Sequence, residues 1–336
     1  MKSLRTLYKN NLESGRLLII MALWLIFMAF AQGSKFFSGS NFLTMAGQFP
    51  EYGLMALGGM LCMMTGGIDL SVVGTANFTA ILCVFIVRSV FGTNGVMPLG
   101  FSAVFFLLAL LAGLVFGGLN AFLISVLRVP PILATLGVNE LLSGICIVMT
   151  GGAAISDFPK EYCNLFATNL GAFLPVKVLV FILIMFLIWF MLEKTTYGTR
   201  LRLYGTNAHV AEYSGINTRR LLFRTYINSS VCAAFGGLMM LATYSSARAD
   251  YGSNYTMQSI LLMVLGGVSP NGGKGRVSGV VTAIVLLKLI ESGINRFRSV
   301  STYYVTFIWG AVLLLALVMD YMSAKPKRIR KVRASV

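Results

Sequence analysis

The chain has 336 residues, of which 57% are hydrophobic and only 11% are charged, and its mean hydropathy is +0.81. Soluble domains carry about 25% charged residues, so this composition excludes a disordered chain and an ordinary soluble enzyme. The net charge of +16 does not indicate nucleic-acid binding, because the basic residues lie between apolar runs and at the two ends of the chain.

Ten apolar runs follow one another along the chain, and a membrane-spanning helix needs about 20 apolar residues. The sequence therefore predicts an all-α polytopic membrane protein with about ten transmembrane helices, built as a single transmembrane domain over residues 1–336. The predicted spans are 17–30, 50–65, 70–91, 99–127, 130–149, 175–192, 222–245, 256–268, 277–294 and 302–321.

The basic residues predict how these spans are oriented. With ten spans, 19 of the 27 Lys and Arg fall on the side of the N-terminus, seven fall on the other side, and Lys288 lies within a span. Positive charge is retained on the cytoplasmic side, so both termini are expected in the cytoplasm and the chain in an inner membrane. The loop 193–221 and the basic tail 325–336 are then cytoplasmic, and the loop 151–174 lies outside.

The chain shows no chemistry of its own that would make it an enzyme. The segment 266–276 resembles a nucleotide-binding P-loop, but Val268 stands where that motif needs glycine and Gly275 follows Lys274 in place of Ser or Thr. The only histidine is His209, and the five cysteines form no CxxC pair. We therefore expect no metal site and no cofactor bound by this chain, and any ATP to be used by a partner subunit.

Ionisable side chains at membrane depth are costly and often functional. Here they are Glu51, Asp69, Glu140, Lys288 and Glu291. Lys288 and Glu291 are three residues apart and could neutralise each other on one helix face. Glu51 follows a proline and could cap a helix start. Asp69 could cap the next helix through amides near Ser71, or face a transport pathway. An ion-coupled secondary transporter would use such a carboxylate, which keeps that class open.

Five segments, taken in order along the chain, resemble one family. They are TGGIDLSVVG at 65–74, VPPILATLG at 129–137, YGTNAHVAEYSGINTRR at 204–220, LGGVSPNGGKGRVSG at 265–279 and GAVLLLALVMD at 310–320. Together they are similar to the permease subunits of sugar-type bacterial ABC importers, the ribose, galactose, xylose and autoinducer-2 group. The sequence departs from the family at Val210, where an Ala-Ala pair is usual.

This resemblance implies a permease that forms a transmembrane pathway for a sugar or sugar-like small solute. A solute-binding protein would deliver the solute outside, an ATPase subunit would dock inside, and a second permease copy or paralogue would complete the pathway. The loop 193–221 would couple the permease to the ATPase. The residues expected to do so are Asn207, Ala211, Glu212, Ser214, Gly215 and Ile216. A purely structural membrane scaffold is the remaining alternative.

The pathway itself is expected near the glycine-flanked junctions and the amide side chains of the spans. The candidates are Gly66, Gly67, Asp69, Ser71, Asn77, Asn120, Asn139, Gly266 and Gly267. A hydroxylated solute needs such polar walls, but each amide could instead make a hydrogen bond between helices.

Overall fold

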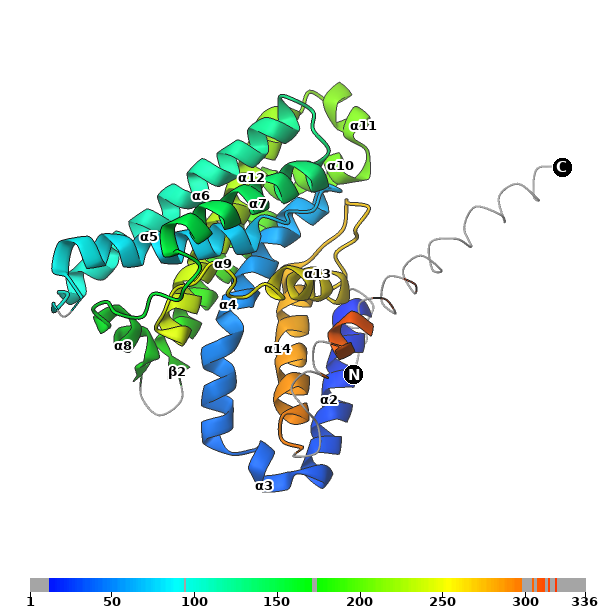
Figure 1. The fold of residues 1–336 in the computed structure, drawn as a ribbon. Coiled ribbons are helices and arrows are strands. Elements are labelled where there is room, and N and C mark those ends of the chain that lie inside the picture. Colours follow the sequence, from blue (N-terminus) through cyan, green and yellow to red (C-terminus); the bar gives the residue numbers. More distant parts are fainter. Residues whose placement is uncertain are drawn as a thin grey trace.

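The computed structural model describes residues 12–93, 95–170 and 174–297, together with 304, 307–311, 314 and 318 of the last apolar run. Apart from one short hairpin, the described chain consists of helices and their connections (Figure 1). Six helical segments are long and apolar enough to cross a membrane: α5 (Val72–Phe91), η1 with α6 (Leu99–Phe101 and Ser102–Ser125), α7 (Pro131–Thr150), α9 (Val176–Lys194), α12 (Thr218–Tyr244) and α14 (Val277–Ile294). The all-α polytopic prediction is confirmed at this level.

The remaining predicted spans differ from these six. Of them, α2 (Leu12–Ala31) and α4 (Gly39–Met64) are long enough, but α2 is apolar only from Gly15 and α4 carries polar residues in its middle. The run 256–268 forms α13 (Tyr255–Leu265), whose 11 residues rise about 16 Å, about half of a bilayer's hydrocarbon thickness. The run 302–321 lies largely outside the described residues. The count of ten spans stays a prediction.

Helix α12 forms the centre of the fold and packs against α4, α5 and α6. Of its most apolar 18-residue stretch, 78% is buried. Glycines allow this close packing. A methyl group added at Gly113 or Gly117 of α6 would come within 2.5 Å of the Val231 Cα and 2.6 Å of the Ile227 Cα on α12. The spacing Gly113-x-x-x-Gly117 is a known device for bringing two membrane helices together.

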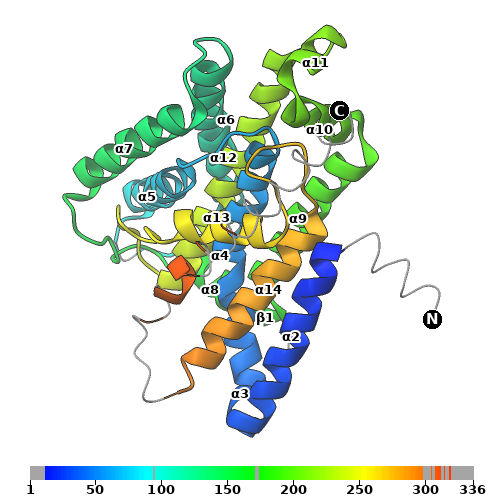
Figure 2. The ribbon, with the colours of Figure 1, turned by 90° about the vertical axis from the view of Figure 1, so that its right-hand side faces the viewer.

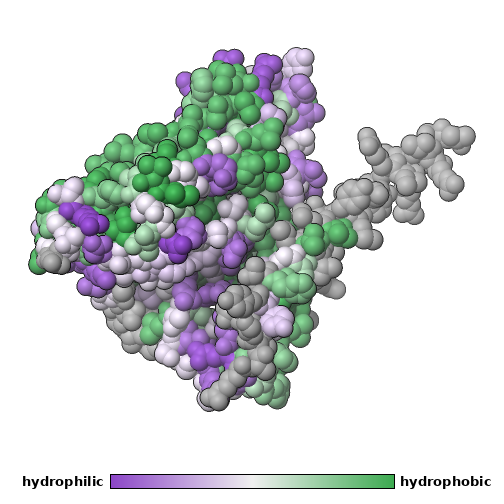
Figure 3. Space-filling view, in the orientation of Figure 1, coloured by the Kyte–Doolittle hydropathy of each residue, from purple (hydrophilic) through white to green (hydrophobic). Residues whose placement is uncertain are grey.

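Helices α6, α7 and α9 present an apolar surface to the outside of the molecule. In each of them only 28% of the most apolar 18-residue stretch is buried. In the space-filling view, hydrophobic residues cover the region of α5, α6 and α7 (Figure 3). Such a surface suits lipid or another membrane-embedded chain rather than water.

A second group of helices lies beside this centre. Helix α3 (Gly33–Phe36) turns the chain from α2 into α4, and α14 lies alongside α2 (Figure 2). The Trp24 Nε1 on α2 donates a hydrogen bond to the Leu289 carbonyl on α14, at 3.1 Å. A side chain at Gly293 would collide with the same tryptophan ring, which explains a glycine on this face of α14.

The connections gather at two opposite ends of the molecule (Figure 1). One end carries α8 (Glu161–Ala167) and the antiparallel hairpin β1 (Asn169–Leu170) and β2 (Leu174–Pro175), in which Asn169 pairs with Pro175 and Leu170 with Leu174. The other carries α10 (Thr196–Thr206) and α11 (Ala208–Tyr213). We call these the α8 end and the α11 end.

Candidate functional site

Asp69 lies at the centre of a buried hydrogen-bond network between α4 and α5. Its Oδ1 accepts from the Ser71 amide at 3.0 Å and the Ser71 Oγ at 2.6 Å, and its Oδ2 accepts from the Ser229 Oγ of α12 at 2.7 Å. Asn120 of α6 donates to the Ser71 Oγ at 2.8 Å. Only 3% of Asp69 is exposed. The carboxylate thus holds the amide of Ser71, the residue before α5, and it also joins the junction to α6 and α12.

Two further amides predicted for the pathway hold elements together. Asn77 of α5 donates to the carbonyls of Ala249 and Tyr251, both at 2.9 Å, and so fixes the loop after α12. Asn139 of α7 accepts from the Gly74 amide of α5 at 3.1 Å. Each of these side chains makes contacts between elements, as the hydrogen-bond alternative expects. Their role in a pathway stays a prediction.

The predicted glycine junctions meet at the α11 end. Gly66 and Gly267 follow α4 and α13 with φ of +82° and +81°, a conformation that L side chains rarely adopt. Gly67 leaves room for the hydroxyl of Tyr226, and Gly266 packs on the backbone of Val280 in α14. Both glycine pairs therefore end a helix and let a second element approach closely.

The loop 266–276 returns to α4 and meets α10. The Gly273 amide donates to the Met64 carbonyl at the end of α4, at 2.9 Å. A methyl group at Gly205 of α10 would lie 1.9 Å from that same carbonyl oxygen and 2.4 Å from the Gly273 nitrogen. The ends of α4 and α10 and the loop after α13 are thus in backbone contact, an arrangement we call the three-loop contact.

The predicted coupling residues mostly build the shape of α11. Asn207 is its N-cap, accepting from the Val210 amide at 3.2 Å. Its end is a Schellman motif, in which the Ile216 amide donates to the Ala211 carbonyl and the Gly215 amide to the Glu212 carbonyl. Gly215 has φ of +76°, as this motif requires. The Ser214 Oγ donates back to the Val210 carbonyl at 2.8 Å.

The exposed surface of α11 differs from the expected one. Ala211 is fully buried within this chain, so its side chain cannot contact an ATPase, and Ile216 is half-buried. The apolar side chains left in solvent are Tyr213, 93% exposed, and Val210, 48% exposed, with the exposed Glu212 between them. Neither Tyr213 nor Val210 is among the coupling residues expected from the sequence.

A groove of about 420 Å³ lies between α10 and the turn after α11. Its walls include three arginines, Arg200, Arg220 and Arg224, and no acidic residue. Among the described residues none of these three guanidinium groups has an ion-pair partner. The surface around α11 therefore combines exposed apolar groups with uncompensated positive charge.

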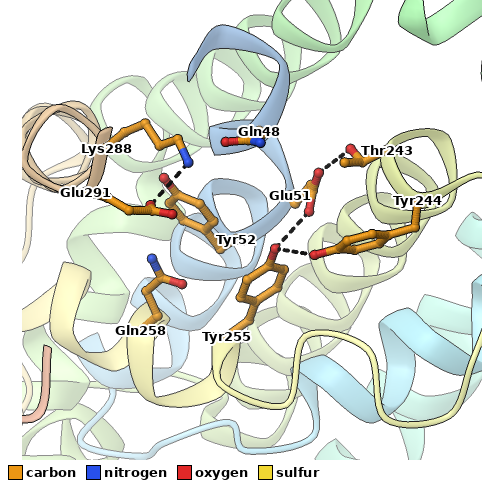
Figure 4. Close-up of a pocket in the computed structure, with 9 residues that line it drawn as sticks. All are labelled: Gln48, Glu51, Tyr52, Thr243, Tyr244, Tyr255, Gln258, Lys288 and Glu291. Atoms are coloured by element: carbon orange, nitrogen blue, oxygen red, sulfur yellow. Dashed lines mark hydrogen bonds and ion pairs between the residues drawn. The ribbon is translucent and has the colours of Figure 1, made fainter. Parts of the chain in front are cut away.

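A polar pocket of about 150 Å³ lies among α4, α12, α13 and α14 (Figure 4). It was not predicted from the sequence. Its lining residues are Gln48, Glu51, Tyr52, Thr243, Tyr244, Tyr255, Gln258, Lys288 and Glu291, and we call it the Glu51 pocket. Polar residues on four different apolar helices were the available signal, but their convergence depends on the packing of the helices.

The expected cap at Glu51 is wrong, because α4 begins at Gly39 and places Glu51 in its middle. The carboxylate instead accepts hydrogen bonds from the hydroxyls of Thr243 and of Tyr255, the latter at 3.0 Å. Lys177 donates to the same Thr243 oxygen at 2.5 Å. Lys288 and Glu291 form an ion pair at 3.1 Å, as their spacing suggests.

The described residues contain no group of three His, Cys, Asp or Glu side chains placed to hold a metal ion. The five cysteines are buried and unpaired.

Comparison with known proteins identifies the family. Residues 41–317 match the family described as "Branched-chain amino acid transport system / permease component". The chain is 29% identical over 302 residues to the Autoinducer 2 import system permease protein LsrD of Escherichia coli strain K12, covering 88% of this chain and 86% of that protein. The LsrD of Shigella flexneri matches to the same extent.

No solved structure matches significantly. The family match covers the six candidate spanning helices, both glycine junctions and the α10–α11 region. The chain therefore belongs to this family of membrane permease components, in which ATP hydrolysis is carried out by a separate subunit.

Proposed function

We propose that this protein is the inner-membrane permease through which an ABC importer moves a small sugar-like solute, of the kind named for its autoinducer-2 relatives. In this proposal the chain crosses the membrane ten times with both termini in the cytoplasm. It binds no cofactor, and the ATP is used by its partner. A binding protein delivers the solute at the α8 end and the ATPase docks at the α11 end.

The observation that carries the proposal is the exposed surface of α11. A tyrosine that is 93% exposed on a short, doubly capped helix gains nothing from the fold of its own chain. Aromatic side chains are enriched where protein surfaces bury one another, and Val210 extends the same apolar surface. The three arginines of the neighbouring groove would pair with acidic residues of the partner.

The basic residues of the described loops support this orientation. Lys194, Arg200 and Arg202 lie in or beside α10, and further basic residues begin α12 and line the loop after α13. Cytoplasmic loops of membrane proteins carry such an excess. The α8 end carries fewer basic residues, and two of them, Arg88 and Arg248, are paired with Asp157 and Asp250.

An exposed carboxylate on α7 favours the presence of a second permease copy. Glu140 is the tenth of its 20 residues and is exposed on the surface of the chain, where its one hydrogen bond to a described residue is a 3.3 Å contact from Asn139. A carboxylate at this depth is too costly to face lipid. We infer that this face of α7 lies against the second permease copy or the aqueous pathway between the two.

The ion-coupled alternative has no comparable support. Asp69 is enclosed by three hydrogen bonds from serines, and Glu291 is neutralised by Lys288. A carboxylate that couples ion movement must exchange its ion with both sides of the membrane, and the partners of Asp69 and Glu291 occupy these two carboxylates instead.

The test removes the exposed side chain of α11. Because Tyr213 contacts little of its own chain, Tyr213→Ala should leave the permease folded in the membrane while the ATPase no longer co-purifies with it and uptake falls about tenfold or more. Leu183→Ala, which truncates a 60% exposed residue in the middle of α9 and away from both ends, serves as the matched control and should leave both unchanged. Full ATPase recovery and normal uptake with Tyr213→Ala would remove α11 as the docking element.

A further inference from the structure

The Glu51 pocket contains polar groups that lack partners. The Tyr52 hydroxyl is buried and makes no hydrogen bond to any residue that the structure describes. The side-chain amides of the exposed Gln48 and of Gln258, which is 8% exposed, also make no hydrogen bond within the described part of the chain. In Figure 4 the Tyr52 ring lies beside the Lys288–Glu291 pair, with Gln258 below it. A buried, unpaired hydroxyl in a membrane domain is costly, and two free amides lie beside it, so a hydrogen-bonding occupant would stabilise this pocket.

The charges of the pocket are already balanced. Lys288 is paired with Glu291, and the Glu51 carboxylate is held by Thr243 and Tyr255, with Lys177 reaching the same threonine. Two acids therefore face two lysines. An ionic solute would have to break these contacts to find its own counter-charge, whereas an uncharged solute would leave them intact.

The wall chemistry excludes an aliphatic occupant. None of the nine lining residues is Leu, Ile, Val or Met. A branched hydrocarbon side chain needs such contacts to leave water favourably. Hydroxyl groups instead match the free amides of Gln48 and Gln258 and the Tyr52 hydroxyl, each of which can donate and accept. The rings of Tyr52 and Tyr255, whose centroids are 5.7 Å apart, supply flat apolar surface nearby.

We propose that the Glu51 pocket is a solute-contacting site within the permease, which hydrogen-bonds the hydroxyl groups of an uncharged, hydroxylated solute through Gln48, Gln258 and Tyr52. Glu51 positions the site by fixing Tyr255 and Thr243. The inference rests on the proposed function and gives the permease its own selectivity, in addition to that of the binding protein. It also rejects leucine-like solutes, although the family description names branched-chain amino acids.

The first experiment measures uptake by the complete importer in proteoliposomes, with autoinducer 2 and L-leucine as the two probes. Losing one hydrogen bond to the solute should lower uptake of autoinducer 2 at sub-saturating concentration about three- to tenfold in Gln48→Ala, Gln258→Ala and Tyr52→Phe. The matched controls are Gln32→Ala and Tyr162→Phe. Gln32 lies before α3, and Tyr162 lies in α8, where its hydroxyl donates a hydrogen bond to the Leu238 carbonyl of α12. Neither residue lines the pocket. Both controls should stay within about twofold of the wild type.

The second experiment needs no solute identity. Gln258→Cys should react with a membrane-impermeant thiol reagent, because the site must open to water during transport, whereas Val285→Cys on the outer surface of α14 should not. The five native cysteines are buried and give a low background.

The outcomes separate the two proposals. If the wild type imports autoinducer 2 but the pocket variants behave like their controls, the pocket assignment is overturned and the proposed function stands. Import of L-leucine but not autoinducer 2 would overturn both the solute class and the pocket assignment. If neither solute moves, an unreactive Gln258→Cys overturns the site, and a reactive one protected by autoinducer 2 supports it.

Discussion

Asp69 shows how one side chain can determine a junction between helices. It reaches two hydroxyls and one amide, on α12 and on the segment that starts α5. The Ser71 hydroxyl it holds is the one that receives Asn120 from α6. Three elements that are distant in sequence therefore depend on a single carboxylate, which explains an acid in an otherwise apolar region without requiring that it carry an ion.

Substitutions at this position separate the carboxylate's hydrogen bonds from its charge. Asp69→Asn should keep most of the stability, because the amide oxygen can accept from Ser71 and the Ser229 hydroxyl can turn to accept from the amide. Asp69→Ala leaves the Ser71 and Ser229 groups buried and unpaired, at a cost on the order of 3 kcal/mol. Thermal unfolding in detergent measures both. Equal losses in the two variants would show that the charge itself is required.

Sequence reasoning singled out the polar residues of these apolar runs and left two roles open, a transport pathway or hydrogen bonds between helices. Asp69, Asn77, Asn120 and Asn139 are conspicuous because polar side chains are rare in apolar runs, and all four have partners in other elements or beside their own helix. The Glu51 pocket was missed for the opposite reason. Gln48 and Gln258 each look like isolated polar residues, and only the packing of α4 against α13 brings them together.

At the scale of elements, the contact between α6 and α12 depends on glycines. Gly113 and Gly117 remove the side chains that would keep the two backbones apart. Gly118, one residue further on, faces open space. The adjacent pair Gly117-Gly118 is prominent in the sequence, but only the structure separates the glycine that packs from the one that does not.

This difference gives an internally controlled prediction. Gly117→Ala places a methyl group 2.6 Å from the Ile227 Cα and should destabilise the permease by about 1–3 kcal/mol through overpacking. Gly118→Ala should be neutral or slightly stabilising, because alanine favours a helix more than glycine does. The measurement is the unfolding temperature of each purified variant in one detergent. If the two variants unfold together, the glycines do not define this contact.

The ends of a helix can be predicted where the sequence contains residues that favour a helix cap. The segment Asn207 to Gly215 gives both ends of α11, because asparagine caps one end and glycine accepts the left-handed turn at the other. The start of α4 was not predictable in this way. Pro50 suggested a helix start, but the first turns of α4, from Gly39, continue through the proline. Polar residues in those turns hid the helix from a search for apolar runs.

At the scale of the whole molecule, orientation gives a direct test. Ala153 and His209 are both exposed and lie at the α8 and α11 ends. Ala153→Cys should be labelled by an impermeant thiol reagent in intact spheroplasts, because its loop is predicted to lie outside. His209→Cys should react only after permeabilisation. The wild type, with five buried cysteines, is the control. The reverse pattern would invert the proposed orientation.

Composition and charge bias therefore predict the class of the molecule well, because a bilayer constrains length, apolarity and the side on which basic residues remain. They predict less about α13. Its apolar run is as strong as a span, yet the helix stops at Gly266, where the chain turns back toward α4. A glycine pair within an apolar run is compatible with either result, and tertiary contacts decide.

The three-loop contact has a mechanical consequence. Gly205 on α10 presses directly on the Met64 carbonyl at the end of α4 and on Gly273 in the loop after α13, with no flexible side chain between them. A pull applied to the neighbouring α11 would reach both helices as a rigid linkage, with little slack to absorb it. Because α4 carries Gln48 and α13 carries Gln258, a movement of α11 would be transmitted to two of the helices that line the Glu51 pocket.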